Sequence, residues 1–212
     1  MAMNIADVVA QGPVIPELLL SDVAHAVPAA RALCAGGLKV IEISVRGAGG
    51  AACIDAVRKG VPEAIVGAGS LTRAVDFAAA DRAGAQFGGT PGLTQDLAAA
   101  SRGARFPLMP GVMTPTEVMT ARNAGFMVQK FYSSTPAGGV SLLKFLHGVF
   151  ADVTFVPSGA LTSELAAEYL HLPNVAGVAG SWTELQTLIA QGDWPRVEAW
   201  ARALAQLKRA IP

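Results

Sequence analysis

Lys130 stands in the middle of an apolar run, FMVQKFYSS (residues 126–134), that is otherwise typical of a strand buried inside a protein. A buried ammonium without a partner is costly, so lysines are usually kept at the surface. Desolvation penalises the charged form of a lysine, and a neutral amine is a nucleophile toward ketones. The iminium that results is an electron sink. A lysine in this setting therefore predicts an enzyme that breaks or forms a carbon–carbon bond through an enamine.

Such a reaction needs a second group that moves protons, and Glu42 in the run KVIEISVR (residues 39–46) is the candidate. We expect Glu42 to be the only other ionisable group buried in a comparable strand, where a carboxyl tends toward a raised pKa that suits proton transfer. Because side chains alternate along a strand, Glu42, Ser44 and Arg46 share one face. Arg46 can hold a carboxylate in bidentate fashion. The alternative is that Glu42 and Lys130 form a buried salt bridge with a purely structural role.

Strand-like apolar runs alternate with helix-period segments along the whole chain, and Gly, Pro or Ser stands at nearly every junction. The eight predicted strands span residues 13–20, 39–46, 64–70, 85–92, 105–112, 126–132, 152–159 and 175–181. Eight such pairs without a break in composition predict a single α/β domain over residues 1–212, a (β/α)8 TIM barrel rather than an open sheet. In this fold the chemistry lies at the C-terminal ends of the strands, which is where Glu42, Arg46 and Lys130 are placed.

Capping signals locate several of the helices. The segment MNIADVVAQG (residues 3–12) predicts an extra N-terminal helix that can close the floor of the barrel. Ser21 is the predicted N-cap of the helix after the first strand, and Gly36 marks its end. Thr114 and Glu117 stand at the spacing of a capping box, so they predict the start of a later helix.

Composition limits the class of partner. The chain has 16 basic and 16 acidic residues and no basic run, so it carries no electrostatic signal for nucleic acid or an anionic membrane, and we expect a small-molecule partner. No apolar run reaches the roughly 18 residues of a membrane span, and the N-terminus lacks the charge order of a signal peptide, which predicts a cytoplasmic protein. Cys34 and Cys53 are expected to be free, buried thiols. No histidine cluster has ligand spacing, so no metal is expected, and no other cofactor.

Eight motifs follow one another in an order and spacing that is specific: HAVPAARALCAGGLKVIEISVR, VPEAIVGAGS, AGAQFGGTPGLT, PLMPGVMTPTEVM, VQKF, AGGVSLLK, FVPSG and GSW. With these motifs nearly the whole chain resembles the 2-keto-3-deoxy-6-phosphogluconate (KDPG) aldolase and 4-hydroxy-2-oxoglutarate aldolase family, class I pyruvate aldolases that include the enzyme of the Entner–Doudoroff pathway. The resemblance implies a homotrimer that reversibly cleaves a 4-hydroxy-2-keto acid. KDPG is the first candidate substrate, with pyruvate and glyceraldehyde 3-phosphate as products.

The resemblance also implies roles for individual residues. Lys130 would form the Schiff base, and Glu42 would be the acid/base. The residues around the pyruvate carboxylate would be Arg46, Ser70, Thr90 and Pro91. The acceptor end of the substrate would meet Tyr132 and, at the phosphate, Ser158, Gly159, Ala160, Gly180 and Ser181.

Several positions around the substrate depart from the family's pattern. Ser70 stands in place of a threonine, Tyr132 in place of a phenylalanine, and Ala160 in place of the last glycine of the phosphate turn. A methyl at Ala160 could obstruct the close approach of a phosphate or a positive φ. One alternative is a drifted or engineered pyruvate aldolase that uses a non-phosphorylated aldehyde, which the hydroxyls of Tyr132, Ser133 and Ser134 would suit. A different class of function is a catalytically idle trimeric barrel used as an assembly subunit.

Overall fold

Parallel strands form a barrel at the centre of the molecule. The computed structural model describes residues 3–46 and 49–210. The strands of these residues pair in parallel in the order β5-β4-β3-β2-β1-β9-β8-β7-β6. They are β1 Val14–Leu18, β2 Val40–Ser44, β3 Ile65–Gly69, β4 Phe87–Gly89, β5 Leu108–Met109, β6 Gly111–Val112, β7 Val128–Tyr132, β8 Thr154–Ala160 and β9 Val178–Ser181.

The two short strands β5 and β6 are halves of the fifth predicted strand. Pro110 separates them, because proline has no N–H to give to a sheet. Its carbonyl still accepts a hydrogen bond from the backbone N–H of Lys130 at 2.8 Å. Since β5 pairs with β4 and β6 pairs with β7, the continuous segment joins the two ends of the sheet and closes it. The predicted eightfold α/β barrel is therefore confirmed.

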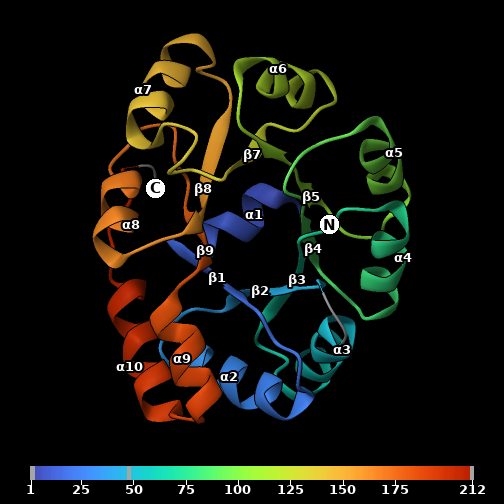
Figure 1. Cartoon of the computed structure of the whole chain (residues 1–212), viewed down its shortest axis with the longest axis vertical. Coiled ribbons are helices and arrows are strands. Elements are labelled where there is room, and N and C mark those ends of the chain that lie inside the picture. Colours follow the sequence, from blue (N-terminus) through green and yellow to red (C-terminus); the bar gives the residue numbers. More distant parts are fainter. Residues whose placement is uncertain (1–2, 47–48, 211–212) are drawn as a thin grey trace.

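Figure 1, a view along the barrel, shows a ring of helices around the strands and one further helix across the centre. They are α1 Ile5–Ala10, α2 Val23–Ala35, α3 Gly50–Gly60, α4 Ala74–Arg82, α5 Gln95–Gly103, α6 Pro115–Asn123, α7 Gly139–Val149, α8 Ser163–Leu170, α9 Thr183–Gln191 and α10 Trp194–Ala205. Within the described part of the chain, none of them combines the length and apolar character needed to cross a bilayer.

The predicted caps are partly right. Thr114 and Glu117 form the expected capping box at the start of α6, and Gly36 ends α2. Ser21, however, is not the N-cap of α2. The carboxylate of Asp22 accepts a hydrogen bond from the N–H of Ala24 at 2.8 Å, so the helix begins one residue later than predicted.

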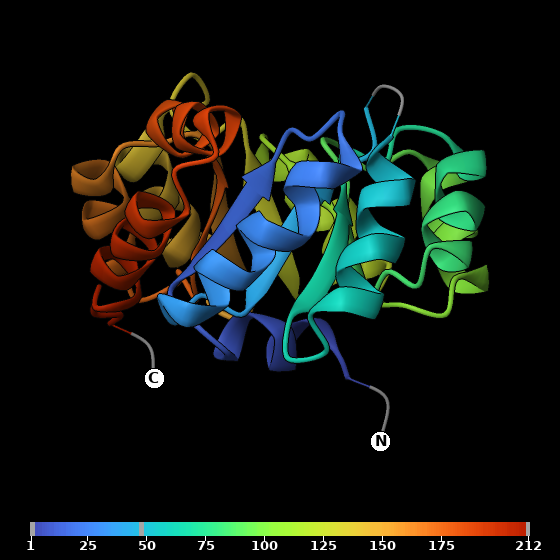
Figure 2. The same cartoon turned by 90° about the horizontal axis from the view of Figure 1, so that it is seen from below.

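Two apolar clusters divide the strand side chains between the outside and the inside of the barrel. Side chains facing outward, such as Ile41 and Ile43 of β2, pack against the surrounding helices. A smaller inner cluster fills the N-terminal end of the barrel and consists of Ile5, Val8, Val9, Ile15, Val40, Phe87, Met109, Val156 and Ala179. Three of these come from α1, which lies beneath the strands in Figure 2. The expected N-terminal helix is thus present and closes the floor.

This floor should contribute measurably to stability. Val8 is fully buried against the inner cluster, so Val8→Ala should lower the free energy of unfolding by about 1 to 3 kcal/mol in urea denaturation. Val75→Ala is the matched control, because Val75 is 64% exposed on α4 and its truncation should change that free energy by less than about 0.5 kcal/mol. Equal effects of the two substitutions would show that α1 is not a structural floor.

Candidate active site

Lys130 and Glu42 meet inside the barrel. Lys130 lies in β7 and Glu42 in β2, 88 residues earlier, and the two side chains are 4% and 0% exposed. The ammonium Nζ of Lys130 donates a hydrogen bond to Oε1 of Glu42 at 2.5 Å. At this distance a proton can pass between an amine and a carboxyl without movement of the backbone.

Glycines on the neighbouring strands make room for this pair. A Cβ placed on Gly69 of β3 would overlap the carboxyl of Glu42. A Cβ on Gly89 of β4 would stand 3.0 Å from both Oε1 of Glu42 and Nζ of Lys130. Any larger residue at these positions would therefore push the two charged groups apart.

The environment of Glu42 favours its neutral form. Burial raises the pKa of this carboxyl above its ordinary value, the neighbouring Lys130 ammonium lowers it, and Glu17 raises it further. Burial is the largest of these effects, and the net direction is upward. The second oxygen, Oε2, is buried and has no hydrogen-bond partner among the described residues. Glu42 is thus prepared to give or take a proton, with one oxygen free to receive it.

Glu17 is the ionisable residue that the sequence reasoning missed. We expected Glu42 to be the only other buried charged group, yet Glu17 in β1 is only 7% exposed. Its Oε1 accepts a hydrogen bond from the hydroxyl of Ser70 at 3.0 Å. A signal was present, because Ile15 and Glu17 alternate in the run PVIPELLL as Val40 and Glu42 do in the next strand.

Ser70 and Arg46 lie at the C-terminal ends of β3 and β2, as predicted. Ser70 has φ of 61° and is the only residue other than glycine with a positive φ in the described ranges 3–46 and 49–210. Arg46 is exposed, and its Nε donates a weak hydrogen bond to Ser44 Oγ at 3.4 Å. Its guanidinium therefore remains available at the mouth of the barrel.

Thr90 and Pro91 follow β4 and pack against the next part of the barrel wall. Thr90 is 1% exposed, and its hydroxyl oxygen accepts a hydrogen bond from the N–H of Gly111 at 3.2 Å. A Cβ at Gly111 would overlap the backbone of both residues. Pro91 itself is exposed. The structure thus fixes this turn on β6, which pairs with Lys130 of β7.

The predicted phosphate end is built by the last turns of β8 and β9. Gly159 pairs with Gly180, and Ala160 pairs with Ser181. The two glycines have φ of 139° and 157°, and a Cβ at Gly180 would overlap the carbonyl of Gly159. Ala160 does not share the positive φ, so the strain that we considered there is absent. Helix α9 begins two residues after Ser181 without a side-chain cap on its first N–H groups.

Tyr132 and two buried serines extend the site from Lys130 toward these turns. Tyr132 is half-buried and lies two residues after Lys130, so its side chain is on the same face of β7 as that of Lys130. In the pairing of β7 with β8, Tyr132 stands opposite Ser158. The backbone N–H of Ser134 donates to the carbonyl of Ser158 at 2.8 Å. The hydroxyls of Ser134 and Ser158 are both buried without a partner in the described part of the chain.

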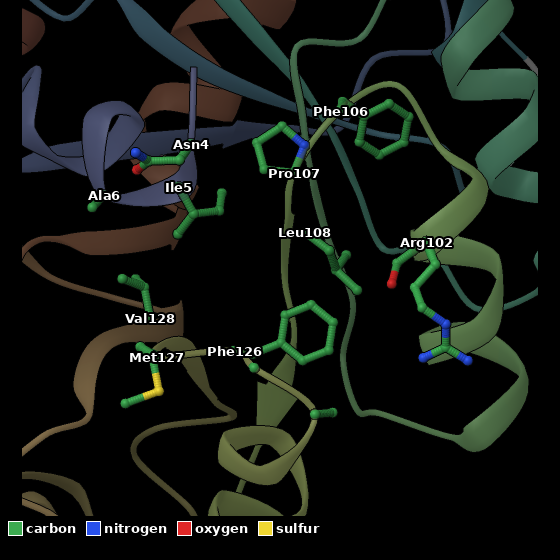
Figure 3. Close-up of a pocket in the computed structure, with 13 residues that line it drawn as sticks. Asn4, Ile5, Ala6, Arg102, Phe106, Pro107, Leu108, Phe126, Met127 and Val128 are labelled. Atoms are coloured by element: carbon green, nitrogen blue, oxygen red, sulfur yellow. The ribbon is translucent and has the colours of Figure 1, made fainter. Parts of the chain in front are cut away.

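A cavity of about 410 Å³ lies at the opposite end of the barrel. Figure 3 shows that its walls come from α1 and from the segments that enter β5 and β7, including Ile5, Leu108 and Val128. Val128 is two residues before Lys130 and belongs to the floor. Neither Lys130 nor Glu42 lines this cavity, so it is separate from the buried pair.

The remaining cysteines and histidines form no second site. Cys34 and Cys53 are free thiols as expected, although Cys34 is only half-buried, and burial raises its pKa to about 11. Across residues 3–46 and 49–210, no group of three or more His, Cys, Asp or Glu side chains has the geometry to hold a metal ion.

A buried lysine in contact with a carboxyl at the C-terminal end of a barrel suits Schiff-base chemistry on a ketone. Residues 5–200 match the family described as KDPG and KHG aldolase. The chain therefore belongs to the KDPG and KHG aldolase family, and it is a lyase of the class I pyruvate aldolase type.

Curated relatives and solved structures agree with this family. The 2-dehydro-3-deoxy-phosphogluconate aldolase of Pseudoalteromonas atlantica is 40% identical over 196 residues, which cover 92% of this chain and 91% of the relative. The structure of KDPG aldolase from Legionella pneumophila, with pyruvate captured as a covalent carbinolamine intermediate, has a TM-score of 0.91 at 34% identity and covers 95% and 98% of the two chains. The Zymomonas mobilis aldolase with 3-phosphoglycerate has a TM-score of 0.91 at 35% identity and covers 99% of both.

The raised pKa of Glu42 makes stability depend on pH once its partner is removed. In Lys130→Met the carboxyl loses the ammonium that lowers its pKa, so the folded state holds the Glu42 proton more tightly than the unfolded state does. The stabilisation of the folded state by this proton is then complete below the ordinary carboxyl pKa of about 4.3. It is lost as the pH rises through the raised pKa of the folded state. Relative to the parent, the variant should lose about 3 kcal/mol of unfolding free energy between pH 5 and pH 8.

Urea denaturation at several pH values measures this change. Lys59→Met is the control, since Lys59 pairs with Asp55 at 2.7 Å on the surface and its loss should shift the unfolding free energy by less than about 1 kcal/mol at every pH. A parallel pH dependence in Lys130→Met and the parent would mean that removal of the Lys130 ammonium does not raise the pKa of Glu42 further.

Proposed function

We propose that this chain is an aldolase that cleaves a 4-hydroxy-2-keto acid to pyruvate and an aldehyde through a Schiff base on Lys130. The observation that carries the proposal is the 2.5 Å contact between Lys130 Nζ and Glu42 Oε1 inside the barrel. The carbinolamine captured in the Legionella structure supports it, because that intermediate forms when an amine adds to the pyruvate carbonyl. No external cofactor is needed on this mechanism, since the iminium is the electron sink.

The reaction begins with the proton of the Lys130–Glu42 pair on Glu42, the form that the raised pKa of this carboxyl favours, so that the amine of Lys130 is free to react. The neutral amine then attacks the C2 carbonyl of the substrate, and the carbinolamine loses water to give an iminium. Glu42 supplies the proton that leaves with this water. Its raised pKa suits both the donation and the return of the proton.

Cleavage follows from the iminium. Glu42, now ionised, takes the proton of the C4 hydroxyl, the C3–C4 bond breaks, and the bonding electrons move into the iminium to form an enamine. The aldehyde leaves, and protonation of the enamine at C3 gives the pyruvate iminium. Hydrolysis then releases pyruvate and restores Lys130. Addition of an aldehyde to pyruvate is the same sequence reversed.

The pyruvate carboxylate is assigned to the mouth beside β2, β3 and β4. The residues proposed to surround it are Arg46, Ser70, Thr90 and Pro91, which follow these three strands in the structure. The exposed guanidinium of Arg46 supplies the positive charge. The carboxylate then fixes the position of C2 relative to Lys130.

KDPG is the proposed substrate, with glyceraldehyde 3-phosphate as the aldehyde. The uncapped N–H groups of α9 and the backbones of Gly159 and Gly180 suit a phosphate. The bound 3-phosphoglycerate of the Zymomonas structure supports a phosphate-bearing ligand.

A non-phosphorylated acceptor is the second candidate, and the buried unpartnered hydroxyls of Ser134 and Ser158 favour it. Each can hydrogen-bond to a hydroxyl of a neutral aldehyde. An idle barrel used only for assembly is disfavoured, because the structure keeps the lysine and carboxyl in contact at a burial cost that a purely structural wall avoids.

We also propose that the chain works as a cytoplasmic homotrimer. Exposed apolar side chains on neighbouring surface elements, among them Met119 of α6 and Phe145 and Val149 of α7, support association. Sedimentation equilibrium should give about three times the chain mass of 21.7 kDa, and a monomer at micromolar concentration would exclude the trimer.

The Schiff base can be trapped directly. Incubation with pyruvate and borohydride should add one reduced pyruvate to the peptide that contains Lys130, as read by mass spectrometry. Lys130→Ala should lose both the label and turnover, whereas Lys59→Ala, in which the lysine is exposed, should keep both. Label on a different lysine, or no label, would rule out the proposed mechanism.

The choice of acceptor can be tested at Ala160. If its methyl crowds a phosphate at the end of β8, Ala160→Gly should lower KM for a phosphorylated substrate by about three- to thirtyfold, which corresponds to about 0.7 to 2 kcal/mol of recovered hydrogen bonding. The unphosphorylated analogue, assayed with the same enzyme, is the control and should show no gain. Equal gains for the two substrates would indicate a general change of the loop. If the parent enzyme prefers the unphosphorylated analogue, the second candidate, a non-phosphorylated aldehyde, is the acceptor.

A further inference from the structure

Glu17 is a buried carboxylate that the mechanism above leaves without a role. It lies in β1 and is 7% exposed. No cationic side chain of the described residues forms a salt bridge with it. A carboxylate in this position is costly, so its contacts indicate what it does.

Glu17 faces the interior of the barrel beside Glu42. The two residues are direct partners in the parallel pairing of β1 with β2, and paired residues of neighbouring strands point to the same face. Ile15, two residues earlier in β1, belongs to the inner apolar cluster, which places Glu17 one layer above the floor. Glu42 stands in the same relation to Val40. The two carboxyl groups are therefore neighbours in the polar layer of the site.

Two contacts hold Glu17 in place. The hydroxyl of Ser70 donates to its Oε1 at 3.0 Å, across 53 residues of sequence. The side-chain amide of Gln186, from α9, donates to its backbone carbonyl at 3.0 Å, and the oxygen of the same amide accepts from the N–H of Leu19 at 3.2 Å. Glu17 thus links the Ser70 turn to the strand next to Glu42.

The charge of Glu17 acts on Glu42. The charged groups that influence the Glu42 carboxyl are Lys130 from β7 and Glu17 from β1. Arg46 follows β2 at the exposed mouth, and the nearest contributions from β3 and α9 are the neutral groups of Ser70 and Gln186. Two neighbouring carboxyl groups share a single ammonium here, so it is costly for both carboxyls to be charged at once. The negative charge of Glu17 therefore favours the protonated form of Glu42.

We propose that Glu17 is a positioning residue of this aldolase site, which anchors the Ser70 hydroxyl and places a carboxylate beside Glu42 that opposes a second negative charge there. The proposal rests on the Schiff-base function assigned above. Through Glu17, the wall of β1 controls at which pH Glu42 can act as a base. It also restrains Ser70, which is proposed to contact the pyruvate carboxylate, so that its hydroxyl donates toward β1 in the free enzyme.

Exchange of the pyruvate methyl protons in heavy water tests this role. In the pyruvate iminium, ionised Glu42 removes a methyl proton, so the exchange rate rises with pH as Glu42 ionises. Glu17→Gln removes the negative charge but keeps a side-chain oxygen for Ser70. The midpoint of the exchange profile, measured by NMR from pH 5 to 9, should then shift downward by about one unit.

Matched variants separate this effect from a structural one. Glu17→Asp retains the charge and should keep the midpoint within about 0.3 units of the parent. Glu63→Gln, at an exposed glutamate, should leave the profile unchanged. Glu42→Gln should slow exchange by about two to four orders of magnitude, which verifies that the profile reports on Glu42.

The outcomes are distinct. A downward shift in Glu17→Gln with rescue by Glu17→Asp supports the proposal, and an unshifted or upward-shifted midpoint overturns it. If Glu17→Gln fails to fold by circular dichroism, Glu17→Ala replaces it: the same negative charge is removed, so the midpoint should again move downward, and an unchanged midpoint overturns the proposal. A parent enzyme that forms no borohydride-trapped adduct would instead refute the Schiff-base function itself.

Discussion

The contact between the Lys130 ammonium and the Glu42 carboxyl is the interaction on which the rest of this structure depends. Neither group is stable alone inside a barrel, because burial of an unpaired charge costs several kcal/mol. Together they are held at 2.5 Å from strands on different sides of the barrel. Gly69 and Gly89 supply the space, and the closed sheet fixes the two strands relative to one another.

The side chains inside the barrel form two layers, an apolar one that stabilises the fold and a polar one that contains the proposed reactive groups. The lower layer is apolar, and α1 completes it with Val8 and Val9. The layer above is polar and contains Glu17, Glu42 and Lys130. This apolar layer lies between the polar groups and the N-terminal end of the barrel, and the turns at the mouth follow the C-terminal ends of the strands. This arrangement explains why the cavity at the floor lies apart from the lysine.

The pyruvate end and the acceptor end of the proposed site differ in how clearly their residues indicate a ligand. The lysine, the carboxyl and the arginine are all present near the predicted pyruvate end. At the acceptor end, the glycine conformations at Gly159 and Gly180 suit an anion, while the unpartnered hydroxyls of Ser134 and Ser158 suit a neutral aldehyde. On the proposed assignment, the bond-making pair lies on β2 and β7, and the aldehyde would meet the end of β7 and the turns at β8 and β9.

The sequence by itself determined the features that depend on neighbouring residues. Periodicity predicted the alternation of strands and helices, the Thr114–Glu117 spacing predicted the start of α6, and residue types singled out Lys130 and Glu42. Contacts of this kind span a few residues, so they can be read along the chain. Even so, Asp22 rather than Ser21 caps α2, because two adjacent residues can both supply an oxygen and the backbone decides between them.

Only the tertiary structure decided how distant segments meet. It brought Lys130 to Glu42 across 88 residues and Ser70 to Glu17 across 53, because closure of the barrel fixes which strands are neighbours and in what register. It also revealed Glu17 as a buried charge, which the apolar run around it had concealed. Burial depends on every strand and helix that packs around a residue, and no local pattern contains that information.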